Sequence, residues 1–128
     1  MDMMVLIGRM LFAAIFIGSG VQHITRAAAM SEHLGARGVP APNLMVRLTG
    51  AAVLIGGISI LLGAYARIGA AFLVIFLIPT AVVMHNYWRL NDPVAKANDQ
   101  AHFFKDLALA GAALVIWYFG SGPFSLVQ

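Results

Sequence analysis

The chain has 128 residues, of which 61% are hydrophobic and 10% are charged, and its formal net charge is +3. A soluble domain carries roughly 25% charged residues and could not bury this much apolar surface, so the composition predicts a single-domain membrane protein. The basic residues are scattered at the ends of apolar segments, which argues against nucleic-acid binding. The chain has no cysteine, which excludes disulfides, thiolate metal sites and thiol redox relays of its own.

Four apolar segments are long enough to cross about 30 Å of hydrocarbon as helices. They cover about residues 3–21, 44–62, 68–87 and 103–119. The first of them is longer than the roughly 7 to 15 residues of a signal-peptide core, so we interpret it as a span that stays attached. Backbone groups in lipid must be paired internally, which excludes an open sheet and predicts an all-α fold.

The links between these segments are long, short and long in turn, covering residues 22–43, 63–67 and 88–102. Short links place successive helices antiparallel, so we expect an integral membrane up-down-up-down four-helix bundle. Residues 25–34 in the first long link are predicted to form a short helix on the membrane surface. Pro42 fits the first turn of the following span.

The distribution of basic residues predicts the orientation. Most of them lie in or beside the two long links, namely Arg26, Arg37, Arg47, Arg89, Lys96 and Lys105. The opposite side has only Arg67 and Arg9. By the positive-inside rule, we expect the long links in the cytoplasm and both termini outside.

This topology brings polar side chains to one membrane level near the cytoplasm. The candidate ligand-binding residues are His23, Arg47, His85, Asn86, Lys105 and Asp106. Histidine can hydrogen-bond a ligand carbonyl or move a proton near physiological pH, which makes His85 the first candidate. In the alternative interpretation His85 is an interfacial residue satisfied by water or by Asn86.

Lys105 and Asp106 are ionisable residues just inside the last span, where charged groups normally face the bundle interior and pair. Adjacent helical residues point about 100° apart. We therefore expect Asp106 to pair with Arg47 or His85, while Lys105 extends to the headgroups. Alternatively, Asp106 is only a favourable negative charge near a helix N-terminus.

Other polar and aromatic residues have expected structural roles. Arg9, on the opposite side, either extends outward to water or binds an acidic group or a lipid phosphate. Pro79 removes a backbone hydrogen bond and is expected to bend the third span. Tyr87 and Trp88 are typical of interfacial anchors at the headgroup level.

The sequence contains no HExxH, Walker, GxGxxG or serine-elbow motif. His23 and His85 are the only histidine pair at span ends, and neither belongs to a longer motif, which argues against haem or a metal ion. No residue is predicted to be catalytic, and the chain is not expected to be an enzyme by itself.

Several segments, taken in order, resemble the DoxX family of small four-helix bacterial membrane proteins over nearly the full chain. They are Arg9, GSGVQHI at 18–24, GARGVPAP at 35–42, GGISILLGAYARIGA at 56–70, HNYW at 85–88 and FFKDLALAGAAL at 103–114. The chain departs from the family pattern twice. Thr49 and Gly50 stand where many members have an acidic residue, and Asp106 stands where an asparagine usually follows the lysine.

The resemblance implies a location in the bacterial cytoplasmic membrane and a tendency toward redox-associated roles. We therefore expect an accessory subunit that binds an isoprenoid quinone or similar lipid near the cytoplasmic interface, with electrons supplied by a redox partner. The alternative is a non-catalytic scaffold whose links recruit a soluble partner. A small-molecule transporter is a weaker alternative, because four short helices enclose little space without forming a homo-oligomer.

Overall fold

The computed structural model describes residues 1–127, and these residues form helices, turns and one isolated β-bridge. The helices are α1 (Asp2–Thr25), α2 (Ala27–Ala36), α3 (Pro42–Leu62), α4 (Ala66–Met84), the 3₁₀ helix η1 (Tyr87–Arg89) and α5 (Pro93–Phe119). Four segments are long and apolar enough to cross a membrane, and they contain α1, α3, α4 together with η1, and α5. The predicted all-α class with four spans is confirmed.

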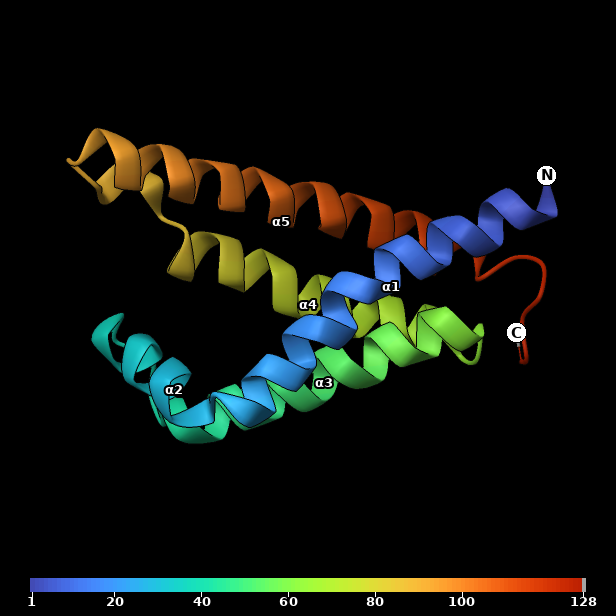
Figure 1. Ribbon diagram of the computed structural model, residues 1–128, viewed down its shortest axis with the longest axis horizontal. Helices are drawn as coiled ribbons and strands as arrows, with labels where there is room; N and C mark the ends of the chain where they lie inside the picture. Colours follow the sequence, from blue (N-terminus) through green and yellow to red (C-terminus); the bar gives the residue numbers. More distant parts are fainter. Residues whose placement is uncertain (128) are drawn as a thin grey trace.

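Successive long helices run in opposite directions, as Figure 1 shows. Both chain ends and the α3–α4 turn lie at one end of the molecule, which we call the terminal end. Helix α2 and the α4–α5 connection lie at the other, which we call the link end. Helix α1 packs against α3, α4 packs against α5, and α3 joins the two pairs by packing against α4. The bundle is therefore a chain of helix pairs in the order α1, α3, α4, α5.

Glycines allow these helices to approach closely. A Cβ atom added at Gly20 of α1 would lie 2.6 Å from the Cβ of Leu54 on α3. A Cβ atom at Gly56 of α3 would lie 3.0 Å from the carbonyl oxygen of Gly69 on α4. Small residues serve this purpose in membranes, where association depends on close packing because lipid tails are as apolar as the helix surfaces.

The first link contains the predicted short helix. Helix α2 follows α1 after Arg26 alone and packs against α3. Gly38 lies just beyond its end, with φ at +79°. Pro42 is in the first turn of α3, as expected. The link therefore folds back along the bundle and brings the end of α2 toward α4 and α5 (Figure 1).

Helix α5 begins ten residues before the last span that the sequence predicts. The Asp92 side chain accepts a hydrogen bond from the backbone N–H of Ala95 at 2.9 Å, and Pro93 occupies the first helical position. This combination is a strong helix start signal, although the residues that follow are hydrophilic. The third link is consequently short, and three turns of polar helix precede the apolar part of α5.

Helix α4 is continuous through Pro79 and ends at Met84. The regular helix therefore ends three residues before residue 87, the expected end of this span, and His85 is the first residue beyond it. A bend of α4 at Pro79 stays a prediction. His85 therefore lies just beyond the last regular turn of α4.

The segment after α5 returns across the terminal end of the bundle. The backbone N–H of Leu126 donates to the Leu62 carbonyl at 3.2 Å, and that of Val127 donates to the Gly63 carbonyl at 3.0 Å. The tail thereby pairs with the α3–α4 turn and satisfies carbonyl groups at the end of α3. Sequence reasoning did not anticipate this cap.

Candidate functional site

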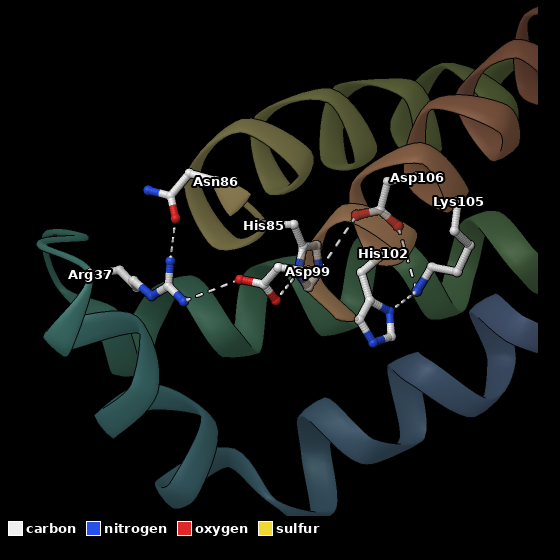
Figure 2. A network of polar contacts seen from close by, with 7 residues as sticks. All are labelled: Arg37, His85, Asn86, Asp99, His102, Lys105 and Asp106. Atoms are coloured by element: carbon white, nitrogen blue, oxygen red, sulfur yellow. Dashed lines mark hydrogen bonds and ion pairs between the residues drawn. The ribbon is translucent and has the colours of Figure 1, made fainter. Parts of the chain in front are cut away.

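Seven polar residues form one connected network at the link end, and Figure 2 shows how they face one another. They come from the end of α2, from the residues after α4 and from α5, and are Arg37, His85, Asn86, Asp99, His102, Lys105 and Asp106. Four of them were candidates from the sequence. The structure adds the other three.

Asp106 is the most buried member of the network, with 5% of its surface exposed. Its Oδ1 lies 3.7 Å from Lys105 Nζ, and its Oδ2 lies 3.7 Å from His85 Nε2. These are ion-pair distances, longer than hydrogen bonds. Within residues 1–127, Oδ2 is buried and has no hydrogen-bond partner. A buried carboxylate oxygen without a donor is costly, because buried polar groups are normally hydrogen-bonded.

His85 lies between two carboxylates. Its Nδ1 is 3.5 Å from Asp99 Oδ1, and its Nε2 faces Asp106. The ring also stacks on His102, with ring centroids 5.1 Å apart and planes 25° apart. The expected contact between His85 and Asp106 is therefore present. These neighbours hold the imidazole in one orientation, where a ring nitrogen could donate to or accept from a bound group.

The face of α5 that carries the network has a helical spacing. Asp99, His102 and Asp106 are separated by three and four residues, which places them on one side of the helix. Sequence reasoning missed Asp99 and His102 because it treated residues 88–102 as a link. Had the Asp92–Pro93 start signal been used, this spacing would have identified both.

Lys105 differs from the expectation that it only extends to the headgroups. Its Nζ lies 3.7 Å from Asp106 Oδ1 and donates to His102 Nδ1 at 3.3 Å. The directions of adjacent residues do diverge at Cβ, but the flexible four-carbon stem of lysine allows the ammonium group to turn back. The half-exposed lysine therefore covers the outer side of the buried carboxylate.

Arg37 ties α2 to the opposite helix pair. Its Nη1 donates to Asn86 Oδ1 at 2.6 Å, and its Nη2 lies 3.8 Å from Asp99 Oδ2. The sequence indicated a role for Arg37 only as one of the basic residues that predict the orientation in the membrane. Its location just after α2 explains the contact, because α2 ends beside α4 and α5.

His23 and Arg47 do not join this network. His23 is buried between α1 and α3, where its Nδ1 lies 3.2 Å from the Val46 carbonyl oxygen and 3.2 Å from the Thr49 hydroxyl. Gly50 makes room for it, since a Cβ there would be 2.5 Å from His23 Cβ. Thr49 and Gly50 thus accommodate His23.

Of the two partners expected for Asp106, the structure has His85 and not Arg47. Arg47 is exposed on α3, and in the part of the chain that the structure describes it has no hydrogen bond or ion pair through its side chain. It follows buried Val46 on α3, and a turn of about 100° per residue places it at the edge of the packed α3 surface, where it is exposed. Its role in ligand binding stays a prediction.

Tyr87 and Trp88 hold the segment after His85 against α5. Their rings pack edge to face with each other and with Phe103 of α5, with centroids 5.4 to 5.6 Å apart. Aromatic contacts of this kind are worth about 0.5–1.5 kcal/mol beyond buried area. The cluster fixes η1 against α5, and Trp88 also remains exposed enough to act as an interfacial anchor.

Arg9 lies at the terminal end and is buried, so it does not extend outward to water, which was one of its two expected roles. Only 4% of its surface is exposed, and its guanidinium group crosslinks the tail to the end of α3. Its acceptors are the carbonyl oxygens of Ser121 (3.1 Å), Pro123 (2.7 Å), Leu61 (3.0 Å) and Phe124 (3.1 Å) and the Ser125 hydroxyl (3.3 Å). Arg9 is therefore a structural residue that satisfies otherwise unpaired backbone oxygens.

Among the described residues, no group of three or more His, Asp or Glu side chains is arranged to hold a metal ion. The link-end network instead combines a buried acceptor, an imidazole and a lysine. Such a set can bind a small polar head through hydrogen bonds and can exchange a proton with it.

These features define a small multi-pass helical membrane protein with a polar network at one end of an otherwise apolar bundle. The DoxX family model matches residues 4–86, and the chain belongs to this family. Inner membrane protein YphA of Escherichia coli is 28% identical over 123 residues, which cover 96% of this chain and 87% of YphA. No solved structure matches the chain. The family match ends at Asn86, so the α5 part of the network lies beyond it.

Proposed function

We propose that this protein is an accessory subunit of a redox system and binds the polar head of an isoprenoid quinone at the link end. The observation that carries the proposal is the Asp106 carboxylate, buried beside His85 with one oxygen lacking a hydrogen bond within the described chain. A quinol hydroxyl group would supply the missing donor, and the His85 ring could donate to a quinone carbonyl.

The surroundings suit a molecule with a polar head and a long apolar tail. The network lies at one end of the apolar, membrane-spanning parts of the helices, so a tail can follow their outer surfaces into the bilayer. His85, His102 and Lys105 surround the buried carboxylate, which gives a head group several polar contacts within a short distance. A quinone is preferred to a phospholipid here because the unsatisfied atom is a carboxylate oxygen, which repels phosphate.

Electrons would come from a partner in this account. The chain has no cysteine with which to hold an iron–sulfur cluster, so its own contribution would be to position the quinone and to move protons. The contacts of His85 with both Asp99 and Asp106 support a role in proton transfer between the head group and the link-end surface.

Asp106→Asn is expected to weaken the binding of a short-tailed quinol analogue by about 10- to 100-fold. This range corresponds to one hydrogen bond to a charged group, worth roughly 1.5–3 kcal/mol. The binding is measured by titrating purified protein in lipid nanodiscs. Asp2→Asn is the matched control, because Asp2 is an exposed acid at the terminal end and its replacement should leave affinity unchanged.

If Asp106→Asn binds the analogue as tightly as the parent, the quinol is not held by this carboxylate and the proposal fails. Absence of binding to the parent protein in nanodiscs would also contradict it. Either result would favour the alternative of a non-catalytic scaffold, in which the link-end network only holds α2, α4 and α5 together.

We further propose that the protein resides in the bacterial cytoplasmic membrane with the link end inside the cell. The named location of YphA supports the membrane, and the basic residues support the orientation. Six of the eight Lys and Arg residues flank α2, lie near the start of α3 or lie between η1 and the middle of α5, and only Arg9 and Arg67 lie toward the terminal end.

The absence of native cysteine permits a direct test of this orientation. A membrane-impermeant maleimide applied to spheroplasts is expected to label Asp2→Cys and to leave Asn91→Cys unlabelled until the membrane is permeabilised. Both positions are exposed and lie at opposite ends of the bundle. The reverse pattern would show that the link end faces outward.

A further inference from the structure

A groove of about 570 Å³ runs between α1 and α5 at the terminal end, far from the link-end network. Gly8 and Phe12 of α1 form one wall, and Val115 and Phe119 of α5 form the other. Its sides are almost entirely apolar. The groove exists because α1 and α5 belong to different helix pairs and do not pack closely along their length.

The end of this groove is cationic. Arg9 lines it, and the Arg9 Nε atom is buried without a hydrogen-bond partner within residues 1–127. Arg67 lines not the groove itself but an adjoining hollow that shares Phe119, Gly120 and Ser121 with it, and its Nε lies 3.7 Å from where a Cβ on Gly120 would be. Neither arginine forms an ion pair in the described chain, and the only acidic residue near this end is exposed Asp2.

We propose that the groove binds one anionic phospholipid, with an acyl chain between α1 and α5 and the phosphate beside Gly120, where Arg67 can reach it. An acyl chain fits the apolar walls, and a phosphate supplies the countercharge that the two guanidinium groups lack. This site is separate from the proposed quinone site. It takes a lipid from the opposite leaflet and uses no residue of the link-end network.

Gly8 offers a way to fill the groove without disturbing Arg9. A Cβ added at Gly8 meets no atom within 4 Å, so a larger side chain can be built there into open space. Gly18, on the same helix, has the same freedom but lies outside the groove. Gly8→Leu and Gly18→Leu are thus a matched pair that differ in whether the groove is occupied.

The test is native mass spectrometry of protein reconstituted in nanodiscs of equal parts phosphatidylglycerol and phosphatidylcholine. The parent is expected to retain phosphatidylglycerol in preference to phosphatidylcholine. Gly8→Leu should reduce the retained phosphatidylglycerol about tenfold, because the side chain occupies the acyl-chain space. Gly18→Leu should retain as much as the parent.

Arg67→Gln tests how much the Arg67 side chain contributes to the preference for an anionic headgroup. The preference for phosphatidylglycerol over phosphatidylcholine should fall about fivefold, since one basic side chain near an anionic lipid contributes about 1 kcal/mol. Arg26→Gln removes an exposed arginine at the link end and should not change the preference. If Gly8→Leu fails to fold, Ala112→Leu fills the same groove from α5 and takes its place.

Three results would overturn the proposal. One is equal retention of both lipids by the parent, and another is undiminished phosphatidylglycerol in both groove-filling variants. The third is a parent dimer that becomes a monomer in Gly8→Leu but not in Gly18→Leu, because the groove would then hold a second copy of the chain and not a lipid. The quinol titration is independent of all three.

Discussion

Replacing Arg9 with alanine is expected to lower the free energy of unfolding by about 3–5 kcal/mol. The guanidinium group donates to four backbone carbonyls and one hydroxyl, which belong to the tail and to the end of α3. Without it, these buried and partly buried oxygens lose their donors. The tail that covers the terminal end should then detach from α3.

The loss in free energy of unfolding is measured by titrating Arg9→Ala and the parent with a denaturing detergent and monitoring helix content by circular dichroism. Arg9→Lys should fall between the parent and Arg9→Ala, because an ammonium group has three donors and cannot form the same planar set of contacts. Arg26→Ala is the control, since Arg26 is exposed at the link end. A loss below about 1 kcal/mol in Arg9→Ala, in the range of a surface contact, would contradict the structural role.

Gly20→Ala is expected to destabilise the protein by about 1–3 kcal/mol, whereas Gly18→Ala should be neutral or stabilising. A methyl group at Gly20 would lie 2.6 Å from Leu54 Cβ and 2.9 Å from Leu54 Cα, so the backbones of α1 and α3 must separate. At Gly18 the methyl group meets nothing within 4 Å, and alanine is the better helix former.

The same detergent titration compares these two alanine variants. The pair is informative because both substitutions are on α1 and change the sequence identically. If both variants were stabilised to a similar degree, α1 and α3 would not be in contact at Gly20, and the packing order of the bundle would be wrong.

The spans could be predicted because long apolar runs in a lipid environment can only form helices. The start of α5 could not be read from hydropathy, since residues 93–102 are polar. Capping chemistry was the relevant signal, and Asp92 followed by Pro93 carries it. The missed helix turns contain Asp99 and His102, so an error of helix boundary became an error in the site.

Part of the site could be predicted because the order and direction of the spans determine the membrane level of each residue. Topology alone places His85, Lys105 and Asp106 at one level, and the structure confirms that they are in contact. Topology does not specify which side of a helix a residue faces, and for that reason it placed Arg47 in the cluster incorrectly. Arg37 and Arg9 depend on how the segments next to the helices fold back, which local periodicity does not encode.

The network and the groove divide the molecule into two ends with different chemistry. At the link end a buried carboxylate lacks a donor, and at the terminal end two arginines lack a countercharge. An anionic headgroup suits only the second, and a hydroxyl donor suits the first. This contrast is why we assign a quinone to the link end and a phospholipid to the groove.

Photoaffinity labelling with an azidoquinone, followed by peptide mapping, tests the central claim most directly. The account predicts light-dependent labelling of the segments around His85 and His102–Asp106, removed by excess unlabelled quinone and strongly reduced in Asp106→Asn. Labelling that is confined to the α1–α5 groove, or that excess quinone does not reduce, would contradict it.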